Sequence, residues 1–446
     1  MDRKVRIFQS LKIFQSKQAV VVGAGVSGLA ACRFLLTLGA RVRLVDAKPD
    51  LPAETLLKVH ADPASAGLTL EAGPHTPAQF ADADLIVLSP GVPVKKLAHV
   101  LADVAPERVV AEMEFASWFL DEPVIAITGT NGKTTTTTLV GHILRHAGLS
   151  TFVGGNIGTP LCDYLLGDAP VDALVIEISS FQLQNCRTFK PRVAALLNFS
   201  ANHLDYHADM EEYLSAKLNL FAQQDHACLA IAPAAMREEL EARHFSRARR
   251  EYYRADTDFA CPGLPGEHNR ENIAAAWRMV QPFGITERQA REAIAAFNAL
   301  PHRIEPVCEA GGVLFVDDSK ATTLESVAAA VASMDRPVRL LLGGVFKGGD
   351  MAELAGKIAG KVLSIGLFGA AREVFEPVLA PLFPVSWDAT LEAAVRRQFG
   401  LARKGDVILL SPGTASFDAY KGYAERGRDF ARVARALLDT GAEAGR

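Results

Sequence analysis

The stretch AITGTNGKTT, residues 126–135, joins an apolar run to a helix-like segment through a glycine-rich turn. The common phosphate-binding loop reads G-x-x-x-x-G-K-[ST]: its backbone N–H groups surround a phosphate, its lysine adds charge and its hydroxyl binds Mg²⁺. Gly132, Lys133 and Thr134 match the end of that pattern, whereas Gly129 lies two residues closer than the pattern requires. We therefore predict a shortened nucleotide loop between a strand and a helix. The alternative, a polar turn with a surface lysine, explains this order less well.

Short runs of β-branched residues alternate with helix-like segments along the chain. This alternation predicts α/β domains with parallel sheets. A chain of 446 residues is too long for one hydrophobic core, and about 150 residues per domain gives roughly three domains. Boundaries are expected after a proline-rich segment and at FNALPHR. The predicted domains are 1–111, 112–300 and 301–446.

Composition argues against several classes of protein. Apolar residues make up 49% of the chain and charged residues 22%, an ordinary globular balance. The formal net charge of −4 offers no basic surface to nucleic acid, and no apolar run is long enough to span a bilayer. The six cysteines are scattered, so neither a disulfide framework nor a zinc site is expected. We expect a cytoplasmic protein that binds no nucleic acid and does not insert into a membrane.

A second glycine-rich turn, GAGVSG, follows the apolar run AVVV near the N-terminus. Gly23, Gly25 and Gly28 form a G-x-G-x-x-G pattern, and Asp46 ends the next expected strand 18 positions after Gly28. This context is typical of a dinucleotide-binding fold, with Asp46 placed to accept hydrogen bonds from a ribose. Taken alone, the pattern favours a nicotinamide or flavin enzyme. The alternative is that three glycines merely permit close packing of a helix on a strand.

Further motifs resolve the choice between these two signals. The loop GTNGKT, taken together with GGNIG (154–158), EISSFQL (177–183), NHLDYH (202–207) and AKLNLF (216–221), resembles the Mur ligase superfamily. The C-terminal segments LPHRIE, DDSKAT and LLSPGTASFD resemble the members that add D-glutamate. The resemblance implies three α/β domains: an N-terminal Rossmann-like domain for a uridine diphosphate substrate, a central P-loop domain for ATP and a C-terminal Rossmann-like domain for the amino acid.

The implied activity is an ATP-dependent amide ligase that adds D-glutamate to UDP-N-acetylmuramoyl-L-alanine in peptidoglycan precursor synthesis. Joining a carboxylate to an amine in water is uphill, so ATP first phosphorylates the carboxylate, and the amine then attacks the acyl phosphate through a tetrahedral intermediate. Phosphoryl transfer depends on positioned charge, which a loop, a lysine and metal ions supply. The expected partners are these small molecules, and the chain is expected to be a monomer.

The resemblance also implies a role for individual residues around ATP and metal. The implied ATP-binding residues are Gly129, Thr130, Asn131, Gly132, Lys133, Thr134, Thr135, Asn272, Arg303, Asp318 and Lys320. Of the last four, Asn272 would face the adenine, Arg303 and Lys320 the phosphates, and Asp318 the ribose. The implied ligands of two Mg²⁺ ions are Thr134, Glu177, His203 and Lys217. Lys217 would act as a carbamate formed with CO₂, which turns a cation into a carboxylate-like group. Glu177 lies in the apolar run ALVIEIS, where an unpaired carboxylate is costly, although a buried structural glutamate is the alternative.

The remaining implied roles concern substrates and catalysis. The implied catalytic residues are Lys133, His203 and Lys217. The implied residues for the UDP substrate are Gly25, Val26, Ser27, Asp46 and Asn156, and those for D-glutamate are Thr322, Lys347, Ser416 and Tyr423. Departures from the usual residues at Asn202, Thr323, Val345 and Tyr423 leave amino-acid selectivity open. Other hypotheses are a dehydrogenase, a P-loop regulator, a ligase for another amino acid and folylpolyglutamate synthase, which lacks the N-terminal UDP domain.

Overall fold

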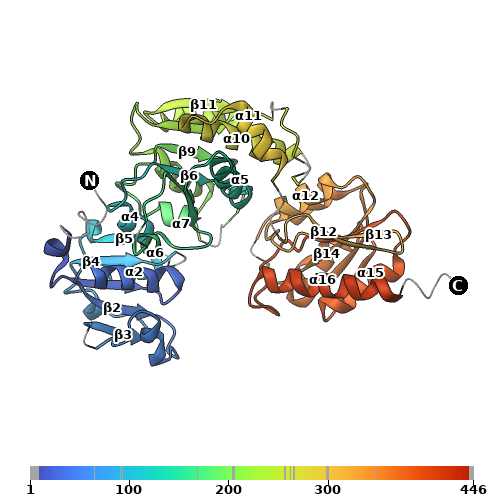
Figure 1. The fold of residues 1–446 in the computed structure, drawn as a ribbon. Coiled ribbons are helices and arrows are strands. Elements are labelled where there is room, and N and C mark those ends of the chain that lie inside the picture. Colours follow the sequence, from blue (N-terminus) through green and yellow to red (C-terminus); the bar gives the residue numbers. More distant parts are fainter. Residues whose placement is uncertain are drawn as a thin grey trace. The chain divides into compact units, whose positions relative to one another are not determined.

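The computed structural model describes residues 10–64, 66–90, 92, 94–167, 169–202, 206–255, 258–261, 263, 264, 267–297, 301–346 and 348–440. Three sheets of 5, 6 and 6 strands, each packed against helices, make up these residues (Figure 1). The chain packs as two compact units: residues 1–199, 209–258 and 271–294 in the first, and 200–208, 259–270 and 295–446 in the second. The three-domain α/β fold predicted from the sequence is confirmed.

The first sheet is fully parallel, with the strand order β3-β2-β1-β4-β5. Its elements are β1 (Gln18–Val22), α2 (Val26–Thr37), β2 (Arg41–Asp46), η1 (Ala53–Lys58), β3 (Leu68–Ala72), η2 (Pro77–Gln79), β4 (Leu85–Leu88), α3 (Val94–Leu97), η3 (Pro106–Arg108) and β5 (Val109–Ala111). The chain order reverses between β1 and β4, which is the point where such sheets bind ligands. The GAGVSG turn follows β1 at this point.

The second sheet is also parallel, with the strand order β11-β10-β9-β6-β8-β7. Its strands are β6 (Val124–Thr128), β7 (Thr151–Gly155), β8 (Ala173–Glu177), β9 (Val193–Leu196), β10 (Leu229–Pro233) and β11 (Arg249–Tyr253). Its helices are α4 (Glu112–Ser117), α5 (Lys133–His146), α6 (Leu161–Leu165), α7 (Ser180–Leu183), α8 (Met210–Leu218), η4 (Asn219–Phe221), η5 (Ala234–Met236), α9 (Arg237–Ala242), α10 (Glu267–Val280), η6 (Gln281–Phe283) and α11 (Glu287–Ala295). All five residues of β6 are buried, so the nucleotide loop starts from the centre of this sheet.

The first two sheets belong to one packed body, because α2 contacts both α4 and α6. Arg33 of α2 donates to both carboxylate oxygens of Asp163 on α6, at 2.8 Å each from Nη2. Beside this pair, Phe34 contacts the rings of Phe115 and Phe119, with centroids 5.7 and 4.9 Å apart. An aromatic cluster and a bidentate ion pair therefore join the helices of the two domains.

The third sheet has the order β12-β13-β17-β14-β15-β16, and β12 is antiparallel to β13. Its elements are β12 (Glu305–Ala310), β13 (Val313–Asp317), α12 (Leu324–Ser333), β14 (Val338–Gly343), α13 (Met351–Ile358), β15 (Val362–Phe368), η7 (Gly369–Ala371), α14 (Arg372–Leu379), β16 (Val385–Asp388), α15 (Leu391–Leu401), β17 (Val407–Leu410) and α16 (Tyr423–Thr440). β13, β17 and β14 are parallel neighbours, so the loops after them lie side by side.

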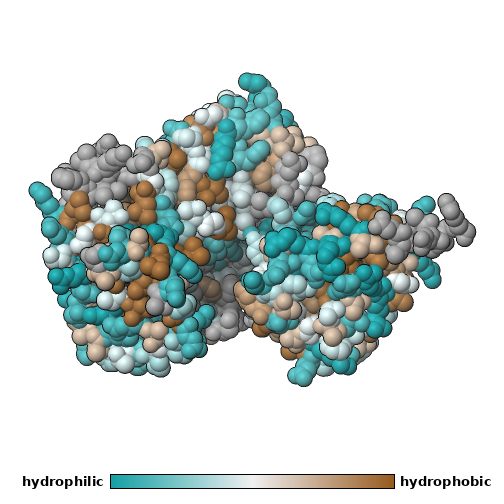
Figure 2. All heavy atoms as spheres, turned by 60° about the horizontal axis from the view of Figure 1, so that its bottom comes forward, coloured by the Kyte–Doolittle hydropathy of each residue, from teal (hydrophilic) through white to brown (hydrophobic). Residues whose placement is uncertain are grey.

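Among the described residues, none of the helices is both long enough and apolar enough to cross a membrane. The face of the molecule drawn in Figure 2 carries hydrophilic and apolar side chains intermixed.

Candidate active site

The predicted nucleotide loop lies between β6 and α5, with its two glycines in the left-handed range of φ. Gly129 has φ 154° and Gly132 has φ 78°. A Cβ at Gly129 would lie 3.0 Å from Leu197, and a Cβ at Gly132 would overlap the side-chain amide of Asn272 on α10. Both glycines are therefore required by conformation and by space. The loop leads directly into the N-terminus of α5. The backbone N–H groups and the helix dipole at such an N-terminus favour a bound phosphate.

Asn198, which follows β9, holds this loop in shape. Its side-chain oxygen accepts the N–H of Asn131 at 2.8 Å, and its side-chain nitrogen donates to the carbonyl of Asn131 at 3.1 Å. Its own carbonyl accepts the N–H of Thr130 at 3.1 Å. The sequence prediction missed Asn198. The available signal was a polar residue just after the buried strand next to β6.

Lys133 and Lys217 meet at a single carbonyl of the loop. Lys133 Nζ donates to the carbonyls of Gly129 and Thr130 at 2.9 and 2.7 Å, and Lys217 Nζ donates to the same Gly129 carbonyl at 2.9 Å. Lys217 is 1% exposed and lies over the ring of Tyr213 at 4.5 Å. Burial, and then the charge of Lys133, lower the pKa of Lys217 well below its ordinary value. Its surroundings thus favour the neutral form of Lys217, a residue that has no distinguishing feature in the sequence.

Glu177, at the end of β8, presents a buried carboxylate with one unused oxygen. Its Oε1 accepts a hydrogen bond from Asn156 Nδ2 at 2.9 Å. Its Oε2 has no hydrogen-bond partner in the described part of the chain, although the residue is only 2% exposed. A buried oxygen without a partner is costly, and a divalent cation is a natural partner for it. Asn156, which we expected beside the UDP substrate, orients Glu177.

In the GAGVSG turn after β1, Gly23 and Gly28 are closely packed, whereas Gly25 is not. A Cβ at Gly28 would overlap the carbonyl of Gly23, so these two glycines are explained by close packing. Among the described residues, no atom lies within 4 Å of the place where a Cβ of Gly25 would be. Asp46 accepts the N–H groups of Ala24 and Lys48 at 2.8 and 2.9 Å. Asp46 therefore braces the turn, and UDP binding beside Gly25 stays a prediction.

Next to Gly25, the start of α2 is accessible. Val26 is 68% exposed, and Ser27 is partly buried. The side chain of Val26, at the first position of α2, is thus largely exposed in the described part of the chain. Val26 and Ser27 are two of the residues that the sequence predicts to contact the UDP substrate.

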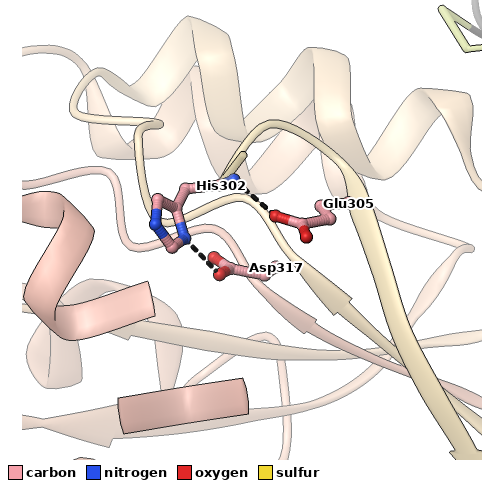
Figure 3. Close-up of side chains that lie close together, drawn as sticks. All are labelled: His302, Glu305 and Asp317. Carbon is pink, nitrogen blue, oxygen red and sulfur yellow. Dashed lines mark hydrogen bonds and ion pairs between the residues drawn. The ribbon is translucent and has the colours of Figure 1, made fainter. Parts of the chain in front are cut away.

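The segment before β12 holds Arg303 between two residues with positive φ. His302 has φ 65° and Ile304 has φ 46°, a conformation that non-glycine residues rarely adopt. His302 Nδ1 lies 2.7 Å from Asp317 Oδ2, and the His302 N–H donates to Glu305 at 2.7 Å (Figure 3). Hydrogen bonds within the protein thus explain why these three groups meet. They fix the backbone on both sides of Arg303 at a cost in strain.

Asp318, the first residue after β13, is buried and bonded within the protein. Its Oδ2 accepts a hydrogen bond from Ser411 Oγ at 2.8 Å, and its Oδ1 accepts the N–H of Ile304 at 3.3 Å. Burial raises the pKa of Asp318 to about 7, although the bond from Ser411 and the charge of Arg303 oppose the rise. We expected Asp318 to contact the ribose of ATP. Both of its oxygens have protein partners here, and the ribose contact stays a prediction.

The residues predicted to bind glutamate come from neighbouring segments of the third sheet. Lys320 Nζ lies 5.1 Å from the ring centroid of Tyr423, a cation–π contact that joins the loop after β13 to the start of α16. Ser416 is buried in the loop after β17, and Thr322 is partly buried in the loop after β13. Thr322 and Ser416 thus lie in the loops that follow β13 and β17, and Tyr423 contacts the first of these loops through Lys320, a predicted nucleotide residue.

Three family models match successive parts of the chain. They are described as the Mur ligase MurD-like N-terminal domain, at residues 17–110, the Mur ligase middle domain, at 127–258, and the Mur ligase glutamate ligase domain, at 302–413. The chain belongs to the Mur ligase family. The nucleotide loop lies in the middle domain of this family, and the strained segment around Arg303 begins its glutamate ligase domain.

Curated Mur ligases match almost the whole chain. The chain is 49% identical to a UDP-N-acetylmuramoylalanine–D-glutamate ligase of Oleidesulfovibrio alaskensis, over 93% of each protein. It is 50% identical to the enzyme of that name from Nitratidesulfovibrio vulgaris, over 94% of this chain and 96% of the relative.

Solved structures of lower identity share the fold. The MurF ligase of Thermotoga maritima in complex with ADP has a TM-score of 0.59 and 17% identity, covering 96% of this chain and 97% of its own. A bifunctional folylpolyglutamate synthase/dihydrofolate synthase from Yersinia pestis, complexed with AMPPNP and a Mn ion, has a TM-score of 0.51 and 17% identity, covering 77% and 92%. These likenesses confirm the Mur ligase fold.

Two predicted site residues, His203 and Lys347, lie outside the residues that the structure describes. For the nucleotide and metal sites, the structure brings together the glycine loop, Asn272, Lys217, Glu177 and Asn156 within one compact unit. It brings Arg303, Asp318, Lys320, Thr322, Ser416 and Tyr423 together in the other unit. Their individual roles stay predictions.

Proposed function

We infer that the chain catalyses the ATP-dependent addition of D-glutamate to UDP-N-acetylmuramoyl-L-alanine, a step in peptidoglycan precursor synthesis. The relatives named for this reaction are 49 and 50% identical over nearly the full chain. The structural observation that carries the ATP half of the reaction is the strand–loop–helix unit at Gly129–Thr135, with Lys133 at its mouth. A dehydrogenase would leave this unit without a role.

We propose that ATP binds the loop and that Lys133 changes partners when it does. Its ammonium group now bonds two loop carbonyls, and a phosphate offers a charged acceptor in their place. Asn272 packs directly on Gly132, which supports its proposed contact with the adenine end of the nucleotide. Arg303, Asp318 and Lys320 are the proposed nucleotide contacts of the third domain. In this scheme Lys133 holds the transferred phosphoryl group, and the acyl phosphate then reacts with the amine of glutamate.

We propose that two Mg²⁺ ions bind Thr134, Glu177, His203 and a carbamate on Lys217. Glu177 Oε2, which has no hydrogen-bond partner among the residues that the structure describes, fits a metal ligand, and the burial of Lys217 supports the carbamate. The neutral amine of Lys217 would form an N–C bond to CO₂ and release one proton, which leaves a carboxylate-like anion. The ions would neutralise charge on the transferring phosphoryl group. Asn156 fixes the orientation of Glu177 through its side-chain amide.

We propose that the first domain, residues 1–111, binds UDP through Gly25, Val26, Ser27 and Asp46. The assignment is supported by the space beside Gly25, where a Cβ would meet no atom of the described residues within 4 Å. Residues 112–300 would form the ATP domain and residues 301–446 the glutamate domain. The proposed glutamate contacts are Thr322, Lys347, Ser416 and Tyr423. Nucleotide-linked substrates support a cytoplasmic location, and we propose a monomer.

The test is phosphate release by the purified chain with ATP, Mg²⁺ and UDP-N-acetylmuramoyl-L-alanine, to which single amino acids are added in turn. We expect release only with D-glutamate. Equal release with L-glutamate or another amino acid would contradict the assigned substrate. Release without the UDP substrate would contradict the ligase assignment and favour a P-loop regulator.

A further inference from the structure

Arg426, in the first turn of α16, is fully buried at 0% exposure. A buried guanidinium is costly unless its donors are satisfied. Its Nε donates to Ser319 Oγ at 3.0 Å, and its Nη2 donates to the Ser319 carbonyl at 2.8 Å. Its Nη1 donates to the Gly343 carbonyl at 3.1 Å, and its Nη2 also donates to the Thr414 carbonyl at 3.1 Å. These four acceptors are neutral groups on three residues, Ser319, Gly343 and Thr414, which lie at the ends of or after three different strands.

The three loops follow β13, β14 and β17, the adjacent central strands of the third sheet. Ser319 directly precedes Lys320 in the first loop, Gly343 ends β14, and Thr414 lies two residues before Ser416 in the third. One side chain therefore bonds the backbone of all three loops. Although burial lowers the pKa of Arg426 to about 10, the group stays a cation at neutral pH.

Around the guanidinium, the loops after β14 and β17 touch backbone to backbone. Thr414 Oγ1 donates to the Gly343 carbonyl at 2.6 Å. Val345 and Ala415 exchange N–H···O bonds of 2.8 and 2.9 Å. Gly344 has φ 126°, and a Cβ there would overlap the Ala415 carbonyl and lie 3.1 Å from Arg426 Nη1. These backbone groups enclose the guanidinium, which agrees with its 0% exposure.

We propose that Arg426 is a positioning residue that touches no substrate but fixes the three loops carrying the glutamate- and nucleotide-binding groups. The inference rests on the proposed assignment of those groups. Five donors in a rigid fork suit this task, because a flexible ammonium group cannot reach carbonyls in three directions at once. Loops held in their binding conformation lose less entropy when the amino acid arrives.

A second buried arginine offers a matched control. Arg339 lies near the other end of β14, where it donates to Asp406 at 2.9 Å and to Ser364 at 3.0 Å. It is 8% exposed. Arg339 joins neighbouring strands at their amino ends, away from the loops that carry the predicted site residues. A purely structural role predicts the same kinetic outcome for both arginines.

The experiment compares Arg426→Lys with Arg339→Lys by Tm and by the KM for D-glutamate and for ATP. We expect a lower Tm for both variants, since a lysine side chain can form fewer of these hydrogen bonds than the arginine that it replaces. Arg426→Lys should raise the KM for D-glutamate by about tenfold or more, whereas Arg339→Lys should change it by less than about twofold. Equal KM changes in the two variants, or no change in either, would overturn the proposal.

Thr414→Val provides a milder change if Arg426→Lys does not fold. It keeps the shape of the side chain but removes the hydroxyl that donates to Gly343. We expect a rise of about threefold in the KM for D-glutamate and faster hydrogen exchange at the N–H groups of Val345 and Ala415. Unchanged exchange at both amides, together with an unchanged KM, would overturn the proposal.

Ser416→Ala separates this inference from the proposed function. If Ser416→Ala leaves the KM for D-glutamate unchanged while Arg426→Lys speeds exchange in all three loops, the assignment of Ser416 fails and the loop-fixing role of Arg426 stands. If Ser416→Ala raises the KM while Arg426→Lys leaves both exchange and KM unchanged, the loop-fixing role fails.

Discussion

The nucleotide loop of the second sheet and the loop cluster of the third sheet both follow the carboxyl ends of parallel strands, but they satisfy their polar groups differently. At the nucleotide loop, Lys133 and Lys217 share one carbonyl, and Glu177 Oε2 has no partner among the described residues. In the third sheet, Asp318 and Arg426 are bonded within the protein. Within the described residues, the first region thus keeps a buried carboxylate oxygen without a hydrogen bond, whereas the second satisfies its buried groups with hydrogen bonds inside the protein.

The largest effect is expected when the charge of the nucleotide loop is removed. Lys133→Ala should reduce phosphate release by about a thousandfold, because one charge contact at 4 Å with an effective dielectric of 20 corresponds to about 4 kcal/mol. Lys190→Ala, at an exposed ion pair with Asp225 in the same domain, is the control and should change the rate by less than about twofold. A Lys133→Ala variant that keeps more than about a tenth of wild-type turnover would contradict the assignment.

The proposed carbamate gives the next largest effect. Lys217→Ala should lose at least about a hundredfold in turnover through weakened metal binding. Added acetate should restore part of the activity, since it supplies the missing carboxylate. Lys217→Arg should not recover, because its guanidinium stays charged and cannot take up CO₂. Removal of CO₂ and bicarbonate should slow the wild type reversibly. Full activity of Lys217→Arg would mean that the residue serves only as a cation.

A smaller effect is expected at the glycine turn of the first sheet. Asp46→Ala removes the acceptor of the Ala24 and Lys48 N–H groups and a proposed ribose contact. The KM for the UDP substrate should rise by about tenfold, while the KM for ATP changes by less than about twofold. Equal rises in both constants would show that Asp46 acts on the whole unit. Binding of NAD at micromolar concentration would revive the dehydrogenase hypothesis.

The last prediction concerns stability and its pH dependence at the third sheet, and not turnover. Burial raises the pKa of Asp318 from 3.8 to about 7, so the native state holds a proton that the unfolded chain has released between these values. The stability contributed by this proton is complete below pH 3.8 and is lost as pH rises to about 7. Asp318→Asn should remove this dependence, a slope of about 1.4 kcal/mol per pH unit, from urea unfolding free energies measured between these limits. An unchanged slope would contradict the raised pKa.

The two regions also differ in how much of their structure could be predicted from the sequence. The nucleotide loop lies within ten consecutive residues, and its strand, glycines and helix follow local rules, so its position and type were predicted. The α/β fold class followed from the same alternation. Asn198 was missed because its contact with the loop arises only when β9 pairs with β6.

Arg426 was missed for a related reason. It lies in YAERGRDFARVAR, a segment with so many charges that burial of one arginine leaves no local signal. Its partners come from three loops that are far apart in the chain. The protein partners of Asp46 and Asp318 were likewise set by tertiary packing. Motifs therefore predicted where the sites lie, but the hydrogen bonds around these residues could be known only from the fold.

The most direct test of the central claim follows an oxygen atom. UDP-N-acetylmuramoyl-L-alanine labelled with ¹⁸O in its carboxylate is incubated with the chain, ATP, Mg²⁺ and D-glutamate, and the released phosphate is analysed by mass spectrometry. Phosphorylation of the carboxylate followed by attack of the amine transfers one carboxylate oxygen to phosphate in each turnover. The account predicts one labelled oxygen in every phosphate formed. Amide formation with unlabelled phosphate would contradict the acyl phosphate, and with it the role assigned to the nucleotide loop.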